Sequence, residues 1–82
     1  MNKTEFKTRI KNSVIDLLID TFKCILRYEY KMQNDEIKQM VSEIDELKTF
    51  EQKIKCLNSY KFMKAPIQNQ LNRLNYYFGG EY

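Results

Sequence analysis

The chain has 82 residues, of which 43% are hydrophobic and 30% charged, and its formal net charge is +3. It is too apolar for a disordered polypeptide and, at this length, is expected to form a single domain over residues 1–82. Two glycines and one proline are too few for the many turns of an all-β protein, so we predict an all-α fold, a small helical bundle of three to four helices.

The first predicted helix covers residues 2–32, where apolar residues recur every three or four positions. One row consists of Phe6, Ile10, Val14, Leu18, Phe22, Ile25, Tyr28 and Met32, and a second of Ile15, Ile19, Phe22, Leu26 and Tyr30. Two rows give a face wide enough for several neighbours, which predicts the central helix of the bundle. Ser13 with Asp16 could cap a separate helix, so a break near residue 12 remains an alternative.

Two shorter helices are predicted over residues 35–48 and 49–63. Asn34 or Asp35 is expected to cap the first of them, whose apolar stripe consists of Ile37, Met40, Val41, Ile44 and Leu47. Thr49 and Gln52 have the spacing of a capping box, and the apolar stripe changes phase there to Phe50, Ile54, Leu57 and Tyr60. We expect a new helix or a kink at Thr49.

The last helix is predicted over residues 66–78. Proline is well tolerated at the first position of a helix, so the helix is expected to start at Pro66. Its apolar positions are Ile67, Leu71, Leu74 and Phe78, and Gly79 can supply the left-handed residue that ends many helices. Residues 79–82 are predicted to form a short tail.

Several classes of function are disfavoured by residues that the chain lacks. It has no histidine, the commonest general base and metal ligand, and no glycine-rich phosphate loop. Cys24 and Cys56 cannot build a zinc site alone, and we expect both to be structural thiols rather than a disulfide. Asp16 and Asp20 are interpreted as part of a solvated helix face. We predict no enzyme activity, no catalytic residue, no metal and no cofactor.

The sequence also bears on the cell compartment. The longest aliphatic run near the start, Leu17 to Ile19, lies between two aspartates and is far too short to span a membrane. The same acids interrupt any signal-peptide region, so we expect a cytoplasmic protein that does not use a membrane as partner.

Charge is distributed unevenly along the chain. Residues 52–80 contain five basic side chains and no acidic one, whereas residues 35–51 contain six acids and two lysines. A field of one sign along one segment attracts a partner of the other sign, which predicts a macromolecular partner.

The last third of the chain carries the candidate binding residues. Amide side chains predominate on the polar face of the last helix, and tyrosines, which are enriched in protein interfaces, follow. Tyr60 and Phe62 alternate with lysines and are interpreted as core residues, with base stacking as the alternative. The residues predicted to bind a partner are Lys61, Lys64, Gln68, Asn69, Asn72, Arg73, Tyr76 and Tyr77.

Residues 60–74 resemble the turn and recognition helix of helix-turn-helix regulators. Phe62, Ile67, Leu71 and Leu74 take the anchoring positions, which leaves Gln68, Asn69, Gln70, Asn72 and Arg73 on or beside the face that would enter a DNA groove. The segment departs from that pattern at Lys61, where a small turn residue is usual. The resemblance implies a DNA-binding regulator, which is the second hypothesis.

The leading hypothesis is a non-enzymatic helical protein that binds a protein partner, as an inhibitor or adaptor of phage or mobile-element type. That comparison rests on small size and on a lysine- and asparagine-rich composition. Nucleic acid is the alternative partner, and a homodimer is compatible with so small a core.

Overall fold

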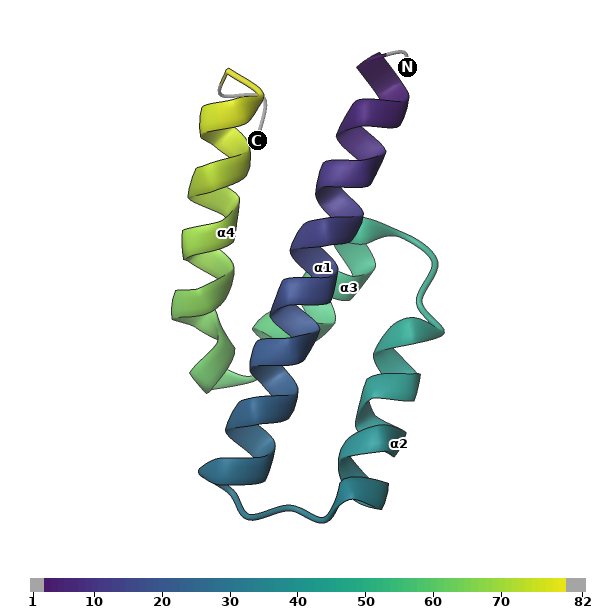
Figure 1. Cartoon of the computed structure of the whole chain (residues 1–82), viewed down its shortest axis with the longest axis vertical. Coiled ribbons are helices and arrows are strands. Elements are labelled where there is room, and N and C mark those ends of the chain that lie inside the picture. Colours follow the sequence, from purple (N-terminus) through teal and green to yellow (C-terminus); the bar gives the residue numbers. More distant parts are fainter. Residues whose placement is uncertain (1–2, 80–82) are drawn as a thin grey trace.

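The computed structural model describes residues 3–79 and contains four α-helices and one short 3-10 turn. The helices are α1 (Lys3–Tyr28), α2 (Asn34–Asp45), α3 (Phe50–Asn58) and α4 (Lys64–Tyr77), and the 3-10 turn η1 (Lys61–Met63) precedes α4 (Figure 1). No strand is present between residues 3 and 79, and the four helices pack together. The all-α prediction is therefore confirmed.

Helix α1 forms the axis of the bundle. Its 26 residues, at 1.5 Å per residue, make a rod about 39 Å long, close to the 41 Å longest dimension of the molecule. α1 contacts each of the other three helices, and Figure 1 shows α2 and α4 on its two sides with α3 behind it. The helix is continuous through Ser13, so the alternative break near residue 12 does not occur.

The core is one cluster of apolar side chains that all four helices supply. No polar or charged residue is buried among residues 3–79. The buried members are Val14, Ile15, Leu18, Ile19, Phe22, Leu26, Ile37, Ile44, Leu57, Met63, Ile67 and Leu74.

The predicted rows of α1 are correct in the middle of the helix and wrong at its ends. Phe6 and Tyr28 near the two ends of α1 are exposed, as is Tyr30 just beyond it, because α2 does not reach the first turns of α1 and α4 does not reach its last turns (Figure 1). Tyr30 still packs its ring against Phe62, with 5.2 Å between the ring centroids.

The junction between α1 and α2 differs from the prediction at both sides. α1 ends at Tyr28 rather than near Met32, because Lys31 adopts a left-handed conformation (φ 56°) and the Met32 amide donates to the Leu26 carbonyl at 3.1 Å. α2 begins at Asn34, but its N-cap residue is Gln33 and no side chain caps it. Asn34 Oδ1 instead accepts a hydrogen bond from Arg27 Nε at 3.3 Å, which ties the two helices together.

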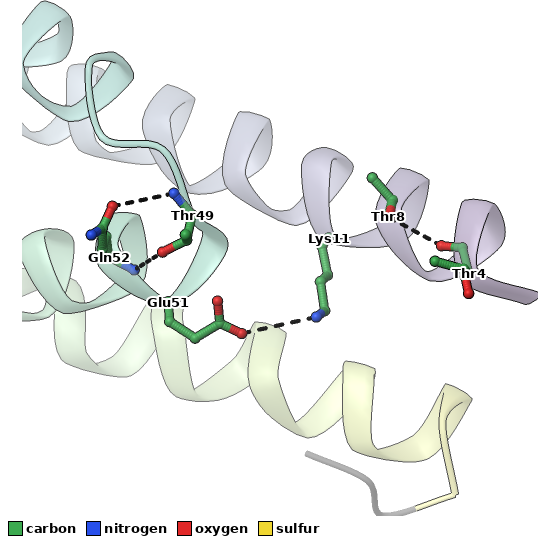
Figure 2. Close-up of polar contacts among 6 residues, drawn as sticks. All are labelled: Thr4, Thr8, Lys11, Thr49, Glu51 and Gln52. Carbon is green, nitrogen blue, oxygen red and sulfur yellow. Dashed lines mark hydrogen bonds and ion pairs between the residues drawn. The ribbon is translucent and has the colours of Figure 1, made fainter.

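The predicted capping box at the start of α3 is confirmed (Figure 2). The backbone N–H of Gln52 donates to Thr49 Oγ1 at 3.1 Å, and the side-chain oxygen Gln52 Oε1 accepts from the backbone N–H of Thr49 at 3.3 Å. Figure 2 also shows Lys11 of α1 reaching Glu51 of α3, with 3.9 Å between Nζ and Oε1. The capping box fixes where α3 starts, and the exposed ion pair links its first turn to α1.

The prediction of one helix over residues 49–63 is wrong at its end, because the helix stops before residue 63. α3 ends at Asn58. Beyond it, the ring centroids of Tyr60 and Phe62 lie 4.9 Å and 5.9 Å from the ring centroid of Phe22. Their interpretation as core-packing residues is therefore confirmed.

Helix α4 begins at Lys64, two residues before the predicted start at Pro66. Proline is accommodated there because the first amides of a helix have no partner within it, so its missing N–H costs no hydrogen bond. Gly79 has φ 65° just after the last turn, as expected for a helix end. Residue 2 of the predicted first helix and residues 80–82 of the predicted tail lie outside the described residues.

Candidate partner-binding surface

All eight residues predicted to bind a partner are exposed. Most of them form one side of α4 together with its preceding turn, and we call this side the α4 outer face. Its members are Lys61, Lys64, Gln68, Asn69, Asn72, Arg73 and Tyr76. The eighth residue, Tyr77, is turned toward α1 and lines a cleft described below.

The opposite side of α4 holds this face in position. Ile67 and Leu74 are buried in the core, and Leu71 and Phe78 are half-buried beside it. Since residues three and four apart share one side of a helix, burial of this stripe turns the amide-bearing side outward. The outer face therefore belongs to a helix that is anchored in the core.

Within the outer face, Gln68 Nε2 donates a hydrogen bond to Asn72 Oδ1 at 2.9 Å. This bond restrains two side chains one helical turn apart and leaves further donors and acceptors free for a partner. Tyr76 continues the same row and is 83% exposed.

The polar face is narrower than the run of amide residues predicts. Gln70 and Asn75 are half-buried, and their side-chain oxygens Oε1 and Oδ1 are buried without a hydrogen-bond partner. Gln70 therefore does not belong with Gln68 and Asn69 on the exposed side, because its position on the helix lies next to the buried stripe.

The uneven charge of the sequence becomes a separation in space. No acidic residue occurs between positions 52 and 79, and Lys61, Lys64 and Arg73 are all exposed there. The acids of α2 and its C-cap, by contrast, are exposed on the other side of α1 (Figure 1). They are Asp35, Glu36, Glu43, Asp45 and Glu46.

A further surface was not predicted from the sequence. At one end of the bundle the first turns of α1 and the last turn of α4 enclose a cleft of about 210 Å³, which we call the aromatic cleft. It is lined by Lys3, Phe6, Lys7, Tyr77 and Phe78. Phe6 and Lys7 follow Lys3 by three and four positions, so the three residues share one side of α1. No sequence signal, however, pairs this side with Tyr77 and Phe78, which follow some 70 positions later.

Contacts inside the aromatic cleft are of two kinds. Lys7 Nζ lies 5.4 Å from the centroid of the Phe78 ring, a cation–π contact between α1 and α4. The Tyr76 and Tyr77 rings meet edge to face with 5.7 Å between centroids, so the aromatic surface continues from the cleft onto the α4 outer face.

The reactive groups of the chain are dispersed. No group of three or more His, Cys, Asp or Glu side chains gathers within metal-binding reach among residues 3–79. Both cysteines are free, but Cys24 is exposed and Cys56 is half-buried, so Cys24 is not the core residue that its apolar neighbours indicate. Asp20 lies 4.0 Å from Lys23, in keeping with a solvated face on α1.

The phenol of Tyr60 has a shifted pKa. Burial raises the pKa of the Tyr60 phenol above its ordinary value of 10.0, with smaller contributions from Cys56 and Glu43. The group belongs to the aromatic cluster around Phe22 rather than to a surface site.

None of the helices within residues 3–79 combines the length and apolarity needed to cross a membrane. Comparison of the chain with protein-family models, with curated proteins and with solved structures gave no match.

Proposed function

We propose that the protein acts without catalysis, by binding another protein through the α4 outer face, as an inhibitor or adaptor. The observation that carries the proposal is that a core-anchored helix presents amides, a tyrosine and two cations to solvent along its whole length. Arginine and tyrosine are enriched in protein interfaces, and amides can pair with a partner's backbone. The small size and lysine-rich composition also agree with inhibitors and adaptors of phages and mobile elements.

The charge pattern favours protein over nucleic acid. Lys64 and Arg73 are the only cations on α4 and lie nine residues apart, about 13 Å along the helix axis. The space between them is filled by neutral amides, whereas tight binding to a phosphate backbone needs many closely spaced cations.

Affinity capture with matched charge variants tests the proposal. The double variant Lys64→Glu with Arg73→Glu changes two exposed cations of the α4 outer face. The control variant Lys38→Glu with Lys48→Glu makes the same change in net charge at exposed positions in α2 and just beyond it.

We expect the native protein and the control variant to capture the same partner from a lysate of the host, in the presence of nuclease. The α4 variant should capture at least about tenfold less, since loss of charged interface contacts commonly costs 1.4 kcal/mol or more. Equal capture by both variants would reject the α4 outer face as the binding surface.

DNA binding is the second candidate, supported by the packing around α4. Met63, Ile67 and Leu74 anchor α4 against the rest of the bundle, while Gln68 and Asn69 near its N-terminal end stay exposed, as a recognition helix requires. Such a regulator would be a dimer, and its affinity for duplex DNA would fall steeply with salt. A mobility-shift assay at low salt tests it, and a protein that shifts no duplex would eliminate this candidate.

A further inference from the structure

We infer that the aromatic cleft is a docking site for an acidic, amphipathic helix of a partner protein, which inserts an apolar side chain between α1 and α4. This inference deepens the proposed function and rests on it. It gives the partner that binds α4 a second contact and specifies the partner's segment as acidic and amphipathic.

The first three turns of α1 have fewer neighbours than the rest of the helix. Figure 1 shows that this end of α1 rises beyond α2 and has α4 beside it. Phe6 lies here and is 47% exposed, and Tyr77 on the facing helix is 57% exposed. The two rings therefore present apolar surface at the mouth of the cleft rather than filling the core.

The size of the cleft favours a side chain over a small molecule. Ligand sites commonly enclose about 300–1,000 Å³, whereas this cleft has about 210 Å³. A single large apolar side chain set into an aromatic-walled depression is the usual anchor of a protein interface. The cleft also runs between two antiparallel helices, which suits an amphipathic helix laid along it.

Charge complementarity defines the partner as acidic. Residues 3–12 of α1 contain four basic side chains and one acid, and residues 64–77 contain two basic side chains and no acid. Lys3 and Lys7 line the cleft itself. Acidic side chains beside the inserted anchor would meet these cations, which steers association and fixes orientation.

A second copy of this chain is a poorer occupant, although its α2 is acidic. Docking of α2 on the cleft would join two different surfaces, and such a heterologous contact closes into a ring or continues as a filament. A separate acidic protein satisfies the same charges without that consequence.

A synthetic helical peptide of about 16 residues, with leucines on one face and glutamates elsewhere, serves as the probe. Binding is measured by fluorescence anisotropy, and the contact surface is mapped by shifts of backbone amide resonances in NMR spectra. Comparison probes are a peptide of the same composition in scrambled order, a counterpart with lysine in place of glutamate, and single- and double-stranded oligonucleotides of similar length.

Two variants with matched exposure separate the cleft from apolar surface in general. Phe6→Ser removes a ring at the cleft, and Leu17→Ser removes an apolar side chain that is 48% exposed elsewhere on α1. Neither side chain belongs to the buried core, so both variants should fold. A third variant, Lys3→Gln with Lys7→Gln, removes the cations of the cleft.

The inference predicts amide shifts centred on residues 3–11 and 74–79 with the leucine–glutamate peptide only. Phe6→Ser should weaken its binding about fivefold or more, because the exposed part of the ring is what the peptide would cover, and Leu17→Ser less than twofold. The lysine variant should weaken binding and reduce its salt dependence.

Each of four results with the peptide, with an oligonucleotide or with the protein alone would overturn the inference. The first three are absence of binding at millimolar peptide, amide shifts centred on α2, and tighter binding of an oligonucleotide at the same residues. The fourth is self-association, seen without peptide as shifts of both α2 and the cleft that depend on protein concentration. The proposed function is judged separately by capture. If Lys64→Glu with Arg73→Glu loses the partner while Phe6→Ser retains it fully, the α4 outer face stands and the cleft is rejected.

Discussion

Truncation of Leu74 tests whether the buried side of α4 is what holds its outer face in place. Leu74 is fully buried, so Leu74→Ala removes its core contacts and leaves a cavity, at a cost of about 3 kcal/mol within the usual range of 2–5. A chain of 82 residues has a free energy of unfolding of roughly 4–12 kcal/mol. The variant should therefore lose a large fraction of its stability.

Leu17→Ala is the matched control, since the same atoms are removed from a helix where the side chain is about half exposed. It should cost less than about 1 kcal/mol, because alanine also has the higher helix propensity. Urea unfolding followed by circular dichroism at 25 °C measures both, with the slope m expected to stay unchanged. Equal costs for the two variants, or a cost below about 1 kcal/mol at Leu74, would refute the packing described for α4.

Three further predictions concern the cap, the shifted phenol and the thiols. Thr49→Ala should lower the free energy of unfolding by about 1 kcal/mol while Thr49→Ser costs little, and equal losses in urea unfolding would show that the hydroxyl does not cap α3. The raised pKa of Tyr60 stabilises the fold fully below pH 10.0, and this stability is lost as pH rises through the folded-state pKa. Tyr60→Phe should therefore lose less stability than the native protein as the pH rises above 10.0, and identical losses would contradict the partial burial of the phenol. Cys24 is exposed and should react faster than half-buried Cys56 with a disulfide reagent, measured by comparing Cys24→Ser with Cys56→Ser, and the reverse order would show that the exposures are misassigned.

The sequence predicted those parts of the fold that depend on local chemistry. Helical spacing identified the buried middle of α1 and the stripe of α2, and the Thr49 and Gln52 pair located the start of α3. Each of these signals acts within a few residues, where hydrogen-bond and side-chain geometry are fixed by the helix itself.

Features that depend on tertiary contacts were not predictable in this way. The end of α1 relies on a left-handed lysine, a conformation for which glycine or asparagine is the usual sequence signal. The exposure of Phe6 follows from where α2 stops along α1, and a period of 3.6 residues carries no information about where a neighbour stops.

Some features of the candidate surface were likewise predictable from the sequence, and others depend on tertiary contacts. The eight predicted residues are exposed because seven of them lie opposite or beside the apolar stripe of α4, and Lys61 lies in the turn before that helix. The aromatic cleft and the half-buried position of Gln70 depend instead on how α4 lies against α1, which a single sequence does not specify.

The most direct measurement of the central claim is site-specific photocrosslinking during capture of the partner. A photoreactive amino acid is placed at Asn72 on the α4 outer face, or at the exposed Gln39 of α2 as the control. A covalent adduct with the captured protein from position 72, and none from position 39, is the result that we predict. An adduct from position 39 alone, or equal yields from both positions, would contradict the claim that α4 binds the partner.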